Sequence, residues 1–173
     1  MEKELESLDA NKTWTLVPLP TGRSPISCKW VLKRKLNPDG TVACYKARLV
    51  ARGFSQVEGL EYSETFSPVL RMTSFRLLMA LATILDLEVH HLDVQTMFLH
   101  GDLPEEIYMS QPPGFESHSQ PNYVCRLHRS LYGLKQSPRL WFQKFNNWML
   151  SHGYSRLLSE PNIYIRHNHV IDY

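Results

Sequence analysis

The chain has 173 residues, of which 43% are hydrophobic and 21% are charged, and its formal net charge is +2. These values exclude a disordered chain, and the apolar run at residues 75–85 is too short to cross a membrane. The acidic start, MEKELESLDA, lacks the apolar stretch of a signal peptide, so we expect an intracellular protein with one sizeable core.

The cysteines and histidines do not indicate a disulfide framework or a zinc site. Three cysteines stand without CxxC spacing, and the eight histidines are scattered along the chain. We therefore expect reduced thiols at Cys28, Cys44 and Cys125.

Charge is segregated along the chain. Residues 29–54 carry seven Lys or Arg and one Asp, residues 86–116 carry seven acids and no Lys or Arg, and residues 121–145 carry five Lys or Arg and no acid. Two interpretations explain this pattern equally well. The charged segments are solvated faces of opposite sign, or they form a cation-binding centre between surfaces that bind polyanions. Both interpretations stay open at this point.

The N-terminal half predicts a short helix followed by a hairpin. The acidic residues 1–8 favour a helix ending near Asn11, and the Pro-rich segment after it is typical of an extended lead-in. In the segment 29–54, two alternating runs flank NPDG, which suits a tight turn between strands. The hairpin has one cationic side, which would bind phosphate or protect an exposed sheet edge.

The C-terminal half alternates helices and strands. FRLLMALATIL is apolar around its circumference, so we expect a helix that Thr73 or Ser74 caps and that is buried on several sides. Strands are expected at 88–103, 107–115 and 162–173. A second helix should start at Ser137-Pro138 and end at His152-Gly153. We expect core positions for Trp30, Phe54 and Phe66 and for the stripe Leu140, Trp141, Phe145, Trp148 and Met149.

Asp93 is the one carboxylate in HHLDVQTMFLHG. On a core strand it would be paired, protonated or holding a cation, because an unpaired buried carboxylate costs several kcal/mol. A satisfied structural carboxylate is the more common of these outcomes.

Three long motifs resemble one known family. KWVLKRKLNPDGTVACYKARLVARGFSQVEGLEYSETFSPV, LDVQTMFLHGDLPEEIYMSQPPGF and SLYGLKQSPRLWFQKF are similar to the reverse transcriptase of copia-type LTR retrotransposons. The resemblance implies an α+β fold: an incomplete right-hand polymerase, with lead-in and fingers over about 1–85 and a partial palm over about 86–173. Its antiparallel palm sheet would pack on helices, and thumb, RNase H, integrase and protease segments would be absent.

The same resemblance implies the site. Asp93 matches the first catalytic aspartate and, with the backbone of Val94, would bind two Mg²⁺ ions, which prefer oxygen ligands. Phe98 matches the aromatic residue that excludes a ribose 2′-hydroxyl. The remaining nucleotide-binding positions are Tyr132, Gly133, Lys135, Lys46 and Arg48. Expected partners are dNTPs, an RNA or DNA template with primer, and the rest of the polyprotein, in a cytoplasmic virus-like particle or the nucleus, with no membrane.

Two departures from the family pattern count against activity. Met97 stands where the family usually has a small residue before the aromatic selector. The Tyr-x-Asp-Asp motif is absent, and Asp172 beside Tyr173 is a poor substitute. We expect a chain truncated before that motif and inactive by itself. The alternatives are a degenerate non-enzymatic remnant with residual nucleic-acid binding, and a structural or interaction protein.

Overall fold

The computed structural model describes residues 1–166, and it combines helices with antiparallel sheets, which confirms the α+β class. The chain divides into two compact units. The first unit holds Met1–Phe66 and Thr96–Trp141, and the second holds Ser67–Gln95 and, among the described residues, 142–166. These units do not test the predicted fingers and palm boundaries.

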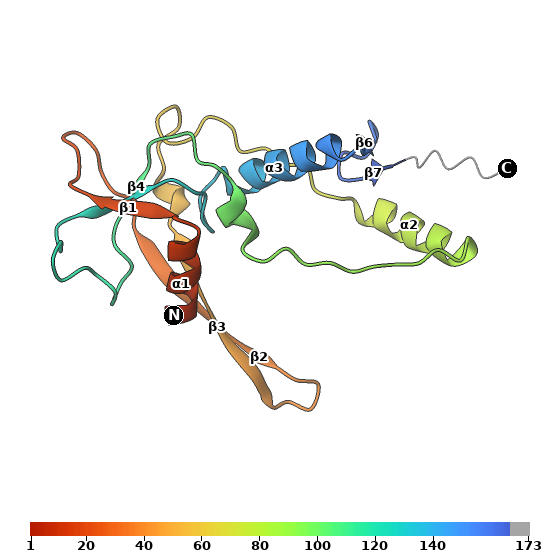
Figure 1. The fold of residues 1–173 in the computed structure, drawn as a ribbon, viewed down its shortest axis with the longest axis horizontal. Helices are drawn as coiled ribbons and strands as arrows, with labels where there is room; N and C mark the ends of the chain where they lie inside the picture. The colour runs from red at the N-terminus through yellow and green to blue at the C-terminus, as the bar shows by residue number, and fades with distance from the viewer. Residues whose placement is uncertain (167–173) are drawn as a thin grey trace. The chain divides into compact units, whose positions relative to one another are not determined.

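The first unit contains a three-stranded sheet, a long hairpin, a helix and two 3₁₀ turns (Figure 1). Antiparallel pairing orders the sheet β1-β5-β4. The predicted N-terminal helix and the predicted hairpin are confirmed, and the lead-in contributes a strand of its own. The elements are α1 (Glu2–Ala10), β1 (Trp14–Val17), β2 (Cys28–Leu36), β3 (Val42–Ala51), η1 (Gly53–Ser55), η2 (Met97–His100), β4 (Tyr108–Met109) and β5 (Val124–Leu127).

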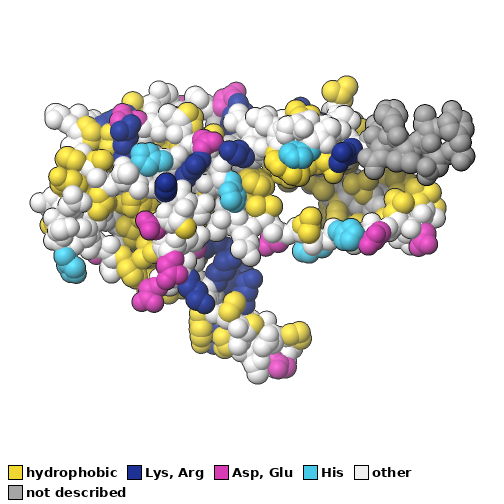
Figure 2. All heavy atoms as spheres, in the orientation of Figure 1, with side chains coloured by type: hydrophobic (Ala, Val, Ile, Leu, Met, Phe, Trp, Pro, Cys, Tyr) yellow, Lys and Arg dark blue, Asp and Glu magenta, His cyan; other side chains and the backbone are white. Residues whose placement is uncertain are grey.

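The β2–β3 hairpin extends away from the three-stranded sheet of its unit (Figure 1). The register pairs Lys33 with Lys46 and Arg34 with Tyr45, so successive pairs lie on opposite faces. One face therefore carries most of the cations, and the other carries Arg34 beside exposed apolar groups, including Leu32 and Tyr45. Figure 2 shows Lys and Arg side chains gathered along this hairpin. The cationic face comprises Lys29, Lys33, Lys35, Lys46 and Arg48.

The core of the first unit lies where the base of the hairpin meets β4 and β5. Leu49, Ile107 and Met109 are fully buried there. Two buried thiols line the same core, and desolvation raises the pKa of Cys28 to about 11 and that of Cys125 to about 12. Both are free cysteines, as the sequence predicts.

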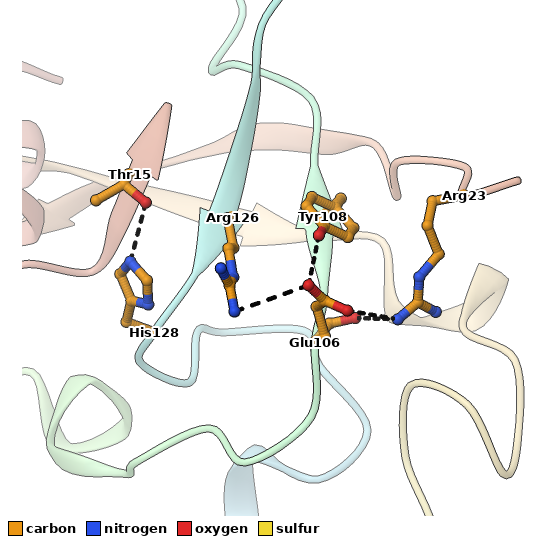
Figure 3. A network of polar contacts seen from close by, with 6 residues as sticks. All are labelled: Thr15, Arg23, Glu106, Tyr108, Arg126 and His128. Carbon is orange, nitrogen blue, oxygen red and sulfur yellow. Dashed lines mark hydrogen bonds and ion pairs between the residues drawn. The ribbon is translucent and has the colours of Figure 1, made fainter. Parts of the chain in front are cut away.

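A polar network crosses β4 and β5 (Figure 3). Glu106 accepts hydrogen bonds from the hydroxyl of Tyr108 at 2.6 Å and from Arg23 at 3.2 Å, and Arg126 lies 3.7 Å away. The Tyr108 hydroxyl, followed by Arg23, lowers the pKa of the Glu106 carboxyl. This network ties the loop that carries Arg23 to the sheet.

The second unit contains α2 (Met72–Ile84), the greater part of α3 (Ser137–Ser151), β6 (Ser155–Arg156) and β7 (Tyr164–Ile165). The expected cap of α2 is wrong, because neither Thr73 nor Ser74 caps it; α2 starts at Met72, and the Ser74 hydroxyl donates to Glu160 at 2.8 Å. The expected burial of α2 is also wrong, since none of its side chains is buried among the described residues. An apolar circumference shows what a helix is able to bury, whereas burial requires neighbours on each side.

The predicted strand over 88–103 is wrong. Residues 88–96 have no helix or strand, and η2 follows at 97–100. Alternating apolar residues form a strand only beside a partner strand that accepts their backbone hydrogen bonds, and no described strand pairs with residues 88–96, whereas Asp102 forms an isolated antiparallel bridge with Arg129. The short strand expected within 107–115 is confirmed as β4.

Several expected core aromatics are exposed. The exposed fraction is 81% for Phe54, 75% for Phe66 and 53% for Trp148, whereas Trp30 packs against the core as expected. The aromatic residues in the sequence indicate an apolar surface, but they do not indicate whether another part of the chain covers that surface. Of the predicted C-terminal strand, Tyr164–Ile165 forms β7, and Asp172 and Tyr173 lie outside the described residues. Within residues 1–166, no helix is long and apolar enough to span a bilayer.

Candidate functional site

Three segments of the first unit converge on one aromatic cluster, defined as Arg48, Phe98 and Tyr132. The rings of Phe98 and Tyr132 meet edge to face, with centroids 4.7 Å apart and planes at 72°. The guanidinium carbon of Arg48 lies 5.1 Å from the Tyr132 centroid, which is cation–π distance. The structure thus brings together three of the residues that the motifs predict, from β3, η2 and the 130–137 segment.

A small pocket adjoins this cluster. It is lined by Lys46, Arg48 and Tyr132, by Thr96 just before η2, and by Glu4, Leu8, Leu99 and Leu131. Two cations and one carboxylate give the lining a net positive charge. An anionic group therefore suits the pocket better than a neutral one.

Thr96 precedes η2 with a φ of 50°, in the left-handed region. For a β-branched residue this conformation costs on the order of 1–3 kcal/mol and is found where tertiary contacts enforce it. The turn that carries Phe98 is therefore held against a local preference.

The 130–137 segment contacts the end of β3 through its backbone. The amide of Ala51 donates to the carbonyl of Tyr132 at 2.8 Å. Gly133 has a φ of +93°, and a Cβ there would overlap the carbonyl oxygen of Ala51 and lie 2.8 Å from Cγ1 of Val50. Glycine is the residue that combines this close approach with a left-handed conformation.

Lys135 is part of a buried polar network. Its amide donates to the side-chain oxygen of Gln56 at 2.8 Å, and its ammonium donates to the hydroxyl of Tyr62 at 2.9 Å while lying 4.3 Å from that ring's centroid. The side-chain amide nitrogen of Gln56 also donates to the side-chain oxygen of Gln136 at 3.0 Å, and both glutamines are almost fully buried. The network fixes the position of the Lys135 backbone.

Sequence reasoning missed Gln56, Gln136 and Ser130. Ser130 is fully buried, and its hydroxyl donates to the carbonyl of Phe98. All three lie inside the recognised motifs, and that position is the signal that could have identified them. Nothing local in the sequence identifies their hydrogen-bond partners.

Asp93 and Val94 belong to the second unit, in the segment without regular structure. Asp93 is exposed, which corrects the expectation of a buried carboxylate on a core strand. The apolar neighbours in sequence do not cover it, because the segment has no sheet partner among the described residues. Its carboxylate forms no ion pair with another residue of the range 1–166.

The described residues do not by themselves fit a two-metal centre. Within residues 1–166, no three His, Cys, Asp or Glu side chains lie close enough to bind one metal ion. One carboxylate and one backbone carbonyl are too few protein ligands for a pair of Mg²⁺ ions.

Comparison with known proteins gives consistent matches. A family model described as reverse transcriptase (RNA-dependent DNA polymerase) matches residues 11–171. The retrovirus-related Pol polyprotein from transposon TNT 1-94 of Nicotiana tabacum is 52% identical over 166 residues, which cover 96% of this chain and 12% of that protein. The Pol polyprotein from transposon RE1 of Arabidopsis thaliana is 43% identical over 166 residues, covering 95% and 11%.

A more distant relative is the transposon Ty1-ER2 Gag-Pol polyprotein of Saccharomyces cerevisiae, which is 30% identical over 130 residues, covering 72% of this chain and 7% of that protein. The chain therefore spans a small part of the length of the polyproteins it matches. No solved structure matches the chain significantly.

Proposed function

Because the chain belongs to the reverse transcriptase (RNA-dependent DNA polymerase) family, we propose that it supplies the nucleotide-binding part of a retrotransposon DNA polymerase. In that reaction a primer 3′-hydroxyl attacks the α-phosphorus of a dNTP, and the bond to the β,γ-diphosphate breaks, releasing pyrophosphate. The observation that carries the proposal is the aromatic cluster beside the cationic pocket, because three separate motifs build it.

Lys46 and Arg48 would bind the triphosphate. The Arg48 guanidinium carbon lies at cation–π distance from the Tyr132 ring, and the N–H donors of a guanidinium point outward in its own plane. The donors thus remain able to bind phosphate oxygens in a charge-assisted geometry. Lys135, already bonded to Tyr62, would act by its charge and by fixing the backbone beside Gly133.

Phe98 would select the sugar. Its ring packs edge to face on Tyr132, and the Arg48 guanidinium packs on Tyr132 in turn, so the cluster would present an apolar edge beside the pocket. A ribose 2′-hydroxyl placed against that edge loses water without gaining a hydrogen-bond partner and meets the ring sterically. Deoxyribose meets neither obstacle.

Asp93 and the carbonyl of Val94 would be the first ligands of the Mg²⁺ ions, and further carboxylates would come from outside residues 1–166. Such ions would supply charge neutralisation for the phosphates. The rest of a polyprotein, a primed template and dNTPs are the partners that this role requires, in a virus-like particle or the nucleus. We expect no primer extension by this chain alone.

Binding of dATP and ATP to the purified chain, by equilibrium dialysis, tests the proposal. The wild-type chain should prefer dATP, and Phe98→Ala should reduce the preference by roughly tenfold, a change of about 1.4 kcal/mol. Phe54→Ala is the matched control, because Phe54 is an exposed aromatic of the same unit. Equal binding of the two nucleotides to the wild-type chain would refute the role of Phe98.

The cationic face of the hairpin favours a second candidate, a remnant that binds nucleic acid without catalysis. Five cations lie on one face of an exposed antiparallel pair, a spacing that suits a phosphate backbone. Fluorescence anisotropy with a labelled primer-template, at about 50 and 200 mM salt, tests it, because phosphate contacts weaken steeply over that range. Binding without any preference between dATP and ATP would favour this candidate over the first.

A further inference from the structure

The turn that carries Phe98 is short and depends on contacts outside itself. η2 comprises four residues, Met97–His100, and its own hydrogen bonds run from Leu99 to Thr96 at 2.8 Å and from Gly101 to Phe98 at 3.1 Å. A single 3₁₀ turn has poor hydrogen-bond geometry and little intrinsic stability. Tertiary contacts therefore decide where Phe98 lies.

Ser130 supplies two of those contacts. Its hydroxyl donates to the carbonyl of Phe98, and its amide donates to the carbonyl of Gly101 at 3.0 Å. The side chain has no exposed surface. A buried hydroxyl that loses its acceptor is left without a hydrogen bond, which costs free energy. The Ser130 hydroxyl therefore favours the position of the Phe98 carbonyl in which this bond is formed.

The Ser130 hydroxyl is closely packed against the backbone at Gly101. A Cβ at Gly101 would lie 2.7 Å from the Ser130 hydroxyl oxygen and 3.0 Å from Cβ of Leu140. A Cβ closer than 3.0 Å to a neighbouring atom is essentially never found, so the backbone at Gly101, directly after η2, packs closely against the Ser130 hydroxyl and lies near the start of α3. A change at Ser130 should therefore alter the packing at the end of η2.

We propose that Ser130 is a positioning residue that sets sugar selectivity by fixing the carbonyl of Phe98 relative to the ring of Tyr132. This inference rests on the proposed role of Phe98. Ser130 and Tyr132 belong to one segment, so the same segment positions Phe98 twice: at its backbone through Ser130 and at its ring through Tyr132. Steric exclusion of a hydroxyl depends on distances of less than an ångström, so loss of the backbone contact should weaken it.

Ser130→Ala and Ser137→Ala form a matched pair of variants. Ser137 is also almost fully buried, and its hydroxyl donates to the backbone carbonyl of Leu131 at 2.5 Å. Both variants lose one buried hydroxyl bond, but only Ser130 contacts Phe98. A purely structural role predicts similar effects for the two.

The first measurement is fluorine NMR of the chain labelled with 4-fluorophenylalanine, with the Phe98 signal assigned from Phe98→Leu. The edge-to-face contact with Tyr132 should shift that signal through the ring current. We expect Ser130→Ala to move it toward its unfolded position and Ser137→Ala to leave it in place. An unchanged Phe98 signal in Ser130→Ala would overturn the inference, whatever the nucleotide data show.

The second measurement is the ratio of dATP to ATP affinity. Ser130→Ala should lower that ratio by about threefold or more with dATP affinity changed less than about twofold, whereas Ser137→Ala should leave the ratio unchanged. If Phe98→Ala lowers the ratio and Ser130→Ala does not, the inference fails and the proposed function stands. If Phe98→Ala has no effect, the proposed function fails, and the assignment of selectivity to Ser130 fails with it.

Discussion

Gly133→Ala should destabilise the first unit more than an equivalent change at an open glycine. Gly133 has a φ of +93°, and its added Cβ would overlap the carbonyl of Ala51 and lie 2.8 Å from Cγ1 of Val50. Gly114 has a similar φ of +81°, but its added Cβ would meet nothing within 4 Å. The pair separates the conformational penalty, which both share, from the steric penalty, which only Gly133 carries.

The expected magnitudes follow from these two penalties. The left-handed conformation costs a non-glycine residue roughly 1–2 kcal/mol. Overpacking against backbone that cannot move freely adds roughly 1–3 kcal/mol. We therefore expect a loss of about 2–5 kcal/mol in the free energy of unfolding for Gly133→Ala and about 1–2 kcal/mol for Gly114→Ala.

Urea unfolding followed by tryptophan fluorescence measures both losses, with the slope against urea as a check that the same surface is exposed. Equal losses for the two variants would refute the close approach of Gly133 to β3. A loss at Gly133 with an unchanged ratio of dATP to ATP affinity would show that the contact supports the fold without shaping the pocket.

The remaining predictions concern charge and reactivity. Glu106→Gln should destabilise the chain near neutral pH, because the Tyr108 hydroxyl lowers the pKa of that carboxyl in the folded state; the difference from wild type should shrink as the pH falls through the lowered pKa, and a difference that grows in acid would contradict this. Iodoacetamide at mildly alkaline pH should alkylate the exposed Cys44 long before Cys125, whose pKa burial raises to about 12, and peptide mass spectrometry showing equal rates would contradict the buried position. Lys33→Ser should reduce the slope of log affinity for a primer-template against log salt by about 1, and an unchanged slope would exclude Lys33 from phosphate contact.

The hairpin shows what local sequence decides. Two alternating runs on either side of NPDG predict the strands, the turn and the cationic face, and the structure has all three. Side-chain alternation and turn chemistry act over a few residues, so the chain needs no distant partner to express them. The helix at residues 2–10 and the end of α3 at Ser151, shortly before Gly153 with its positive φ, follow from equally local signals.

The segment around Asp93 shows what local sequence leaves open. Its apolar pattern is compatible with a strand and with a covered carboxylate, yet the described residues provide neither a strand partner nor a cover. The exposed α2 has the same explanation, because burial depends on a second surface rather than on the helix alone.

The family and the types of residue in the candidate site were readable from the sequence, because the three motifs are long and occur in one order. Their convergence was decided by tertiary structure: Arg48, Phe98 and Tyr132 are distant in sequence and meet through a backbone contact at Gly133 and a buried hydroxyl at Ser130. Contacts of this kind join segments that are 30 or more residues apart, here 32 for the Ser130 bond, and no periodicity within either segment encodes them. The physical reason is that a buried polar group is satisfied by whichever acceptor the packing brings to it, and packing is a property of the whole unit.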